Sequence, residues 1–311
     1  MKTGNKDKDM NIERTTDRVP PAGKSLDVPD EPTFFQESLH QLRRNKGAIA
    51  GLVVIAIFLA VGIFAPLVAP HDPLAQTIEL RKAPPLTEGY LLGTDDLGRD
   101  MLSRLIFGAR ISMVIGVVSV GIALVFGLLI GVISGYYGGW FDKIVMRIID
   151  IMLAFPYVLL TIVIVAILGA SLTNAMIAIG ISQIPRYVRL VRASVLAEKE
   201  ADYVTAERSI GASDLELMFG SILPNCLAPI SVQATLGVGE AILSSAALSF
   251  LGLGAQPPTP EWGLMIASSR EFITSAWWIV TFPGIATLFA VLGFNLFGDG
   301  LRDILDPKLR D

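Results

Sequence analysis

The chain has 311 residues, of which 52% are hydrophobic and 17% are charged, and its mean hydropathy is +0.58. Soluble domains carry about 25% charged residues, so this composition excludes an ordinary soluble protein and indicates one that lies in a bilayer. The net charge of −4 argues against a nucleic-acid-binding surface, so we expect no nucleic acid partner. A single cysteine, Cys226, excludes an internal disulfide and a cysteine metal cluster.

The first part of the chain is polar. Residues 1–33 are rich in Lys, Asp, Thr and Pro and hold few large apolar residues, which predicts a disordered cytoplasmic tail. Phe35, Leu39 and Leu42 then recur at helical spacing beside polar residues. This pattern predicts a short amphipathic helix on the inner leaflet, before the first membrane span.

Long uncharged stretches follow, and a spanning helix needs roughly 20 apolar residues. The run between Asp150 and Arg186 is long enough for two spans and contains a turn-like segment from Gly169 to Asn174. We therefore predict an all-α membrane protein with six transmembrane helices. Their ranges are 47–69, 108–134, 145–168, 174–194, 226–248 and 276–298.

Lys and Arg near the spans are retained on the cytoplasmic side. If both termini lie inside, the inner side holds 19 of the 25 Lys and Arg residues. This bias predicts a protein with both termini in the cytoplasm. The 1–2 connection, about 70–105, is then an ordered extracytoplasmic loop, and the 4–5 connection is cytoplasmic.

The 4–5 connection carries eight charged residues between Glu198 and Gly220. Its sequence, with Ala206 and Gly211 followed by Leu223-Pro224, resembles the cytoplasmic EAA loop of ABC importer permeases. Aligned on Gly211, the first three loop positions hold Thr205, Ala206 and Glu207, of which only the alanine matches that pattern.

Other segments extend the likeness from about residue 40 to the end of the chain. They resemble the C-type permease subunit of the dipeptide/oligopeptide/nickel importers. The segments are Leu92-Gly93-Thr94-Asp95-Asp96-Leu97-Gly98-Arg99-Asp100, Met146-Arg147-Ile148-Ile149-Asp150, Leu248-Ser249-Phe250-Leu251-Gly252-Leu253-Gly254 and Gly298-Asp299-Gly300-Leu301-Arg302-Asp303.

The resemblance implies a type I ABC importer permease fold in the bacterial inner membrane, surrounded by lipid. It also implies a heterodimer with a B-type permease subunit, two ABC ATPase subunits and an extracytoplasmic solute-binding protein. ATP and Mg would bind to the ATPases, so this chain needs no cofactor and is not itself an enzyme. The implied cargo is a di- or oligopeptide. A nickel or metal-chelate importer and a glutathione importer stay open, as does a channel or secondary carrier that works without ATP.

The family likeness suggests a division of the chain into four parts. They are the tail (1–33), a segment with the interfacial helix, the first span and the outer loop (34–106), a permease core of five helices with a coupling element at 198–224 (107–300), and a cytoplasmic C-terminal tail (301–311).

Within the coupling element, the resemblance assigns contact with the ATPases to the residues that align with the family loop. Gly211 can supply the sharply bent backbone between two short helices, and a small Ala206 allows close approach. The alternative is a solvated inner loop with positive-inside charges. The residues assigned to coupling are Thr205, Ala206, Glu207, Gly211, Leu223 and Pro224.

A few charged residues fall in or beside the spans. Glu240 is the only acidic or basic residue in the fifth span, where a carboxylate costs about 2.5–3.5 kcal/mol. It is therefore predicted to face either a translocation path or an internal partner. Arg147 and Asp150, three residues apart, predict a structural ion pair on one helix face. Arg186, Arg189 and Arg192 are interpreted as reaching lipid phosphates, with contact to the coupling element as the alternative.

Small residues and prolines shape the helices. Gly127, Gly131, Gly135 and Gly139 recur every four residues and predict a smooth stripe on which another helix packs. Pro156, Pro185 and Pro283 predict kinks in spans 3, 4 and 6.

Overall fold

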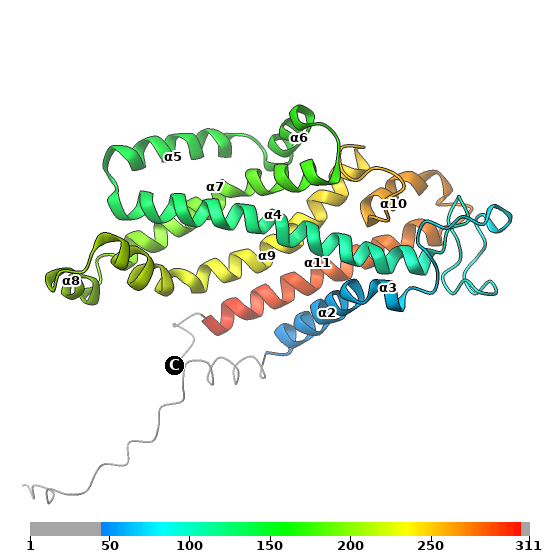
Figure 1. Ribbon diagram of the computed structural model, residues 1–311, viewed down its shortest axis with the longest axis horizontal. Coiled ribbons are helices and arrows are strands. Elements are labelled where there is room, and N and C mark those ends of the chain that lie inside the picture. Colours follow the sequence, from blue (N-terminus) through cyan, green and yellow to red (C-terminus); the bar gives the residue numbers. More distant parts are fainter. Residues whose placement is uncertain (1–44, 306–311) are drawn as a thin grey trace, which may run out of the picture.

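The computed structural model describes residues 45–305 (Figure 1). The chain in this range forms helices and loops, without a strand. The long helices run along one axis, with α4 packed on α7 and α11 packed on α2 and α9. The predicted tail at 1–33 and the predicted interfacial helix lie outside the described residues. The all-helical prediction is confirmed.

Four helices are long and apolar enough to cross a membrane. They are α2 (Lys46–Ile63), α4 (Met101–Tyr137), α9 (Leu223–Phe250) joined to a π-helical segment (Glu216–Ile222), and α11 (Trp278–Leu305). A single turn, α3 (Ala65–Val68), follows α2. Since α11 continues to Leu305, residues 301–305 of the predicted C-terminal tail are helical.

The third predicted span is not one helix. It divides into α5 (Gly139–Ala154) and α6 (Tyr157–Leu168), which are bent by 95° relative to each other. Phe155 is extended, with ψ 137°, and precedes Pro156. Because a residue before proline avoids the helical conformation, the helix ends there and does not merely kink.

The fourth predicted span is α7 (Leu172–Glu198), which begins where the Ser171 side chain accepts a hydrogen bond from the Asn174 N–H. The helix exists as predicted, but it is not among those apolar enough to count as a span. Three arginines lower its hydropathy. By length and composition, four of the six predicted spans are confirmed, or five if the bent α5–α6 pair is one span.

The predicted glycine stripe on α4 packs against α7. A Cβ at Gly127 would lie 2.3 Å from the Tyr187 Cβ, and one at Gly131 would lie 2.7 Å from the Val191 Cβ. The last member of the stripe, Gly139, lies beyond the end of α4, and a Cβ added there would meet nothing within 4 Å. The other glycines therefore allow α4 and α7 to approach closely along their length.

The two ends of the bundle differ in structure. One end, at the left of Figure 1, gathers α8 (Asp202–Ser209) and the start of α9, and it lies on the same side as the start of α2 and the end of α11. Asn45 Nδ2 donates a hydrogen bond of 3.2 Å to Asp303 Oδ2 there. The opposite end holds the 69–100 loop and α10 (Trp262–Ser269).

The 69–100 loop is fixed by buried charges. Asp95 accepts hydrogen bonds from the Arg99 backbone N–H (2.9 Å) and the Arg99 Nε (2.6 Å), and lies 3.4 Å from the Arg104 Nε. Partial burial and the neighbouring Asp95 charge raise the pKa of Asp96. Trp278 Nε1 donates to the Thr94 carbonyl oxygen at 3.0 Å, which ties the loop to α11.

Candidate functional site

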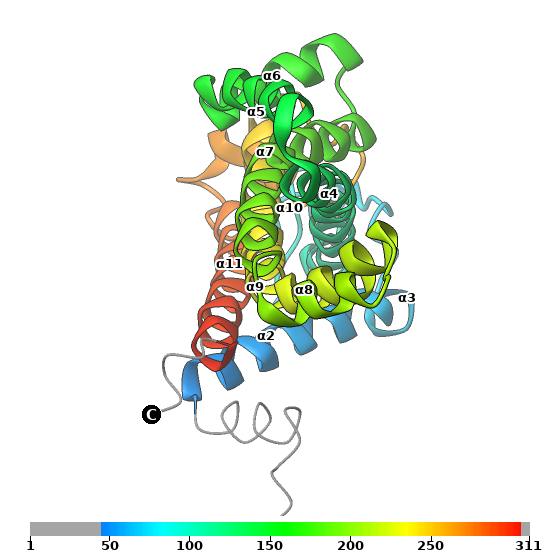
Figure 2. The ribbon, with the colours of Figure 1, turned by 90° about the vertical axis from the view of Figure 1, so that its left-hand side faces the viewer.

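The segment between α7 and α9 stands outside the bundle. Figure 2 shows α8 lying across the end of the long helices. The chain leaves α8 through Gly211, whose φ of +97° lies in the left-handed region that favours glycine. The next turn starts with Ser213, whose N–H and Oγ both donate to Glu216 Oε2, at 2.8 and 2.9 Å. These local signals produce two short helices joined by a sharp bend.

A small apolar cluster anchors this segment to the bundle. Val204 of α8 is fully buried against Leu217 and Ile222 of the π-helical segment. Tyr203 donates a 2.7 Å hydrogen bond to Glu198 and accepts one of 3.0 Å from Asn225 Nδ2. Desolvation and the Glu198 carboxylate raise the pKa of Tyr203 to about 12, so the phenol keeps its proton. The segment is therefore tied to the ends of both α7 and α9.

The outer face of the segment carries exposed apolar side chains. Ile210 is 86% exposed and Leu215 is 66% exposed, on either side of the Gly211 bend. Because both side chains lie on a mostly polar segment that projects from the bundle, they make this segment a candidate interaction surface. We call the exposed group Ile210, Gly211 and Leu215 the outer knob, where outer means the side that faces away from the bundle.

The six residues predicted to act in coupling divide into two groups. Exposed positions are Thr205, Ala206, Gly211 and Pro224, while Glu207 and Leu223 are half-buried. Glu207 points back to the bundle and accepts a 2.5 Å hydrogen bond from Ser221 Oγ. Glu207 thus holds the two short helices together and is not part of the outer knob. The structure adds Ile210 and Leu215, which the sequence analysis missed because an exposed apolar residue looks like a core residue in the sequence.

The arginines of α7 form a ladder of ion pairs. Arg192 binds Asp142 of α5 through two hydrogen bonds of 2.5 and 2.6 Å. Arg189 NH2 lies 2.8 Å from Asp150 Oδ1, also on α5. The interpretation that these arginines reach lipid phosphates is therefore corrected, because acidic side chains on a neighbouring helix neutralise them.

The same ladder corrects the predicted pair on α5. Within residues 45–305, Asp150 pairs with Arg189 of α7 and not with Arg147 of its own helix. Spacing along one helix showed that Arg147 and Asp150 share a face, but the approach of α7 supplies a cation at closer range.

Glu240 has a partner on α7. Its Oε2 lies 2.5 Å from Arg186 NH1, and the two side chains are 33% and 44% exposed. The Arg186 guanidinium also lies 5.4 Å from the centre of the Tyr157 ring on α6. The Arg186–Glu240 pair agrees with the prediction that Glu240 has an internal partner. Because the Glu240 side chain is also partly exposed, the prediction that it faces a translocation path stays a prediction.

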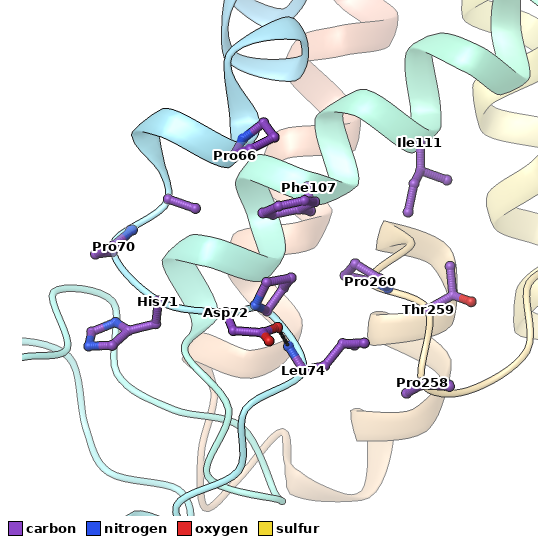
Figure 3. A pocket seen from close by; sticks show the side chains of 12 residues that line it. Pro66, Pro70, His71, Asp72, Leu74, Phe107, Ile111, Pro258, Thr259 and Pro260 are labelled. Atoms are coloured by element: carbon purple, nitrogen blue, oxygen red, sulfur yellow. Dashed lines mark hydrogen bonds between the residues drawn. The ribbon is translucent and has the colours of Figure 1, made fainter.

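A hollow opens at the other end of the molecule. It has a volume of about 760 Å³ and lies between the 69–74 segment, the start of α4 and the 258–260 segment (Figure 3). Its walls include five prolines together with Phe107, His71 and Asp72. Sequence reasoning did not find this hollow, because it forms between segments about 190 residues apart. Among the described residues, no group of three or more His, Cys, Asp or Glu side chains could hold a metal ion.

This geometry defines the class of the protein. It is a multi-pass helical membrane protein with an element that projects from one end. The family model of binding-protein-dependent transport system inner membrane components matches residues 127–311. The model of the N-terminal TM domain of oligopeptide transport permease C matches residues 33–85. The chain therefore belongs to the family of binding-protein-dependent ABC transporter permeases.

Curated relatives cover most of the chain. A di/tripeptide transport system permease protein, DppC, of Pseudomonas aeruginosa is 52% identical over 285 residues, covering 90% of this chain and 94% of the relative. The dipeptide permease DppC of Escherichia coli K12 is 53% identical, covering 92% and 97%. The probable D,D-dipeptide permease DdpC of the same strain is 47% identical, covering 90% and 94%.

A solved structure supports the fold. The inward-facing MetNI methionine ABC transporter matches with a TM-score of 0.54 and 19% identity, covering 66% of this chain and 98% of the matched chain. At this identity the likeness concerns the fold alone, which is that of a type I ABC importer permease.

Proposed function

We propose that this chain is one half of a heterodimeric permease that takes up dipeptides, with a B-type permease subunit as the other half. The observation that carries the proposal is 52–53% identity, over nine tenths of the chain, to permeases named for di- and tripeptide transport. Two ABC ATPases would supply the energy from bound ATP and Mg, and an extracytoplasmic solute-binding protein would deliver the peptide. The chain itself would hold no ATPase site and need no cofactor.

The proposed topology has six crossings of the inner membrane, with both termini in the cytoplasm. The crossings are α2, α4, the broken α5–α6 pair, α7, α9 and α11. In this topology the ion pairs of α7 neutralise its arginines, which lowers the cost of placing a polar helix in the bilayer. The end that carries α8 is then cytoplasmic, in agreement with the excess of Lys and Arg on that side.

The 198–224 segment would couple ATP hydrolysis to movement of the helices. The exposed outer knob would dock on an ATPase, and the buried contacts of Val204 would pass its movement to α7 and α9. Thr205 and Ala206 would lie at the edge of the contact. Closure of the ATPases on ATP would open the path outward, and hydrolysis would reverse the change.

The first experiment tests the bend in this segment. The Gly211→Val variant places a β-branched side chain at φ +97°, which costs about 1–3 kcal/mol of backbone strain. We expect dipeptide uptake by the assembled complex in proteoliposomes to fall by about tenfold or more, while membrane insertion is unchanged. The matched control is Gly220→Val, since Gly220 is exposed, lies in the same segment and leaves open space of at least 4 Å around an added Cβ.

The second experiment tests docking directly. An Ile210→Glu change alters a side chain that is 86% exposed, so the fold of the chain should be unaffected. Because the change buries an unpaired carboxylate in the proposed contact, co-purification of the ATPases should be lost. Normal co-purification and uptake in the Ile210→Glu complex would show that the outer knob does not form the contact.

A further inference from the structure

A polar group of side chains lies midway along α7 and α9. Arg186 is about 18 Å from the inner end of α7, and Glu240 is about 15 Å from the outer end of α9, at 1.5 Å per residue. Tyr157 and Gln183 lie beside them, with 3.5 Å between the Gln183 Nε2 and the Tyr157 hydroxyl. In the proposed topology these groups lie deep in the membrane, where polar side chains mark a site of function.

The ion pair leaves much of its hydrogen-bonding capacity free. Arg186 uses NH1 for Glu240, and Glu240 uses Oε2 for Arg186. The guanidinium has five N–H donors and the carboxylate has a second oxygen, and among the described residues no other group forms a hydrogen bond with them. Arg186 is 44% exposed and Glu240 is 33% exposed, so the residues of this chain do not close off the free atoms.

Two buried hydroxyls on the same helices also lack partners. Ser182, one turn from Arg186 on α7, is 5% exposed, and Ser245, five residues after Glu240 on α9, is 1% exposed. Neither Oγ has a hydrogen-bond partner within residues 45–305. Unpaired polar groups of this kind are rare in folded proteins, and they add polar character to the middle of α7 and α9.

A dipeptide carries an ammonium group and a carboxylate at most about 7 Å apart. Moving both charges through a path without countercharges would be costly, because buried charges need partners. Resting on the proposed function, we propose that Arg186 and Glu240 form a substrate site in the path. Arg186 binds the terminal carboxylate and Glu240 binds the terminal ammonium. When the peptide leaves, Arg186 and Glu240 form their ion pair with each other again.

The other pairs of the ladder fit this role less well. Asp142 also accepts a hydrogen bond from Ser134 and binds Arg192 through two others, so its oxygens are occupied. Arg189 and Asp150 lie nearer the inner end and are each more than half exposed. The Arg189–Asp150 pair has the same chemistry but is not part of the group formed with Tyr157 and Gln183, and it is therefore the matched control.

The first test compares charge-neutral pairs in the complete reconstituted complex. We expect the Arg186→Gln/Glu240→Gln variant to assemble and to lose about tenfold in maximum uptake of Ala-Ala. The KM should stay unchanged, since the binding protein selects the peptide. Arg189→Gln/Asp150→Asn should transport as the wild type does, and Arg186→Lys/Glu240→Asp should recover most of the loss. Uptake of the double-glutamine variant within twofold of the wild type would overturn the proposal.

The second test uses the wild-type complex, so it does not depend on how variants fold. A dipeptide that contains p-benzoylphenylalanine is delivered by the binding protein, irradiated during turnover and located by mass spectrometry. Cross-links within α7 near residue 186, or within α9 near residue 240, support the site, and cross-links confined to other segments overturn it. A wild-type complex that takes up no dipeptide would instead refute the proposed function.

Discussion

The contact between α4 and α7 can be tested by adding a single methyl group. In Gly127→Ala the new Cβ would lie 2.3 Å from the Tyr187 Cβ and 3.4 Å from the Tyr187 backbone. Tyr187 is fully buried, so it cannot rotate away and the helices must move apart. Gly121→Ala, six residues earlier on the same helix, meets nothing within 4 Å and is the matched control.

The two substitutions share one stabilising effect, because alanine favours a helix over glycine by about 1 kcal/mol. Overpacking opposes it only at Gly127, by about 1–3 kcal/mol. Gly127→Ala should therefore lower the free energy of unfolding by up to about 2 kcal/mol, while Gly121→Ala should leave it unchanged or raise it. Titration with sodium dodecyl sulfate, followed by circular dichroism, measures both. If Gly127→Ala proves as stable as Gly121→Ala, the close packing of α4 on α7 is refuted.

Two further predictions concern the end of the molecule that holds the 69–100 loop. Removal of the indole N–H in Trp278→Phe leaves the Thr94 carbonyl oxygen without its donor and should cost about 1–3 kcal/mol, measurable as a lower melting temperature. Glu261 accepts a 2.7 Å hydrogen bond from the Leu264 N–H, and burial raises its pKa. The folded state thus binds this proton more tightly than the unfolded state, so the contribution of Glu261 to stability is full below the unfolded pKa and falls as the pH rises through the folded pKa. Glu261→Gln keeps an acceptor without titrating, and should gain stability relative to the wild type from pH 5 to pH 8; a constant difference across that range would contradict the pKa shift.

The apolar helices could be predicted from the sequence because a spanning helix has one strong requirement, a long uncharged run. The ranges predicted for α2, α4, α9 and α11 each fall on a helix of the structure. The helix ends were less certain, since local capping sets them. Asp100 starts α4 seven residues before the predicted position, where its side chain accepts a hydrogen bond from the Ser103 N–H at 2.9 Å.

Contacts between helices could not be predicted in the same way. The spacing of Arg147 and Asp150 described one helix, but the partner of Asp150 comes from α7, 39 residues later in the chain. The bend in the 198–224 segment could be predicted, because it depends on the positive φ of one residue, Gly211, and glycine adopts such a φ without strain. The roles of Ile210 and Leu215 needed the structure, since only burial distinguishes an exposed apolar residue from a core one.

The ion-pair ladder explains why a helix as polar as α7 can lie beside apolar ones. Each arginine of α7 binds an acidic side chain from α5 or α9, so the helix brings its charges into the bundle already neutralised. The same pairs hold α5, of whose residues only Ile149 is buried, beside α7.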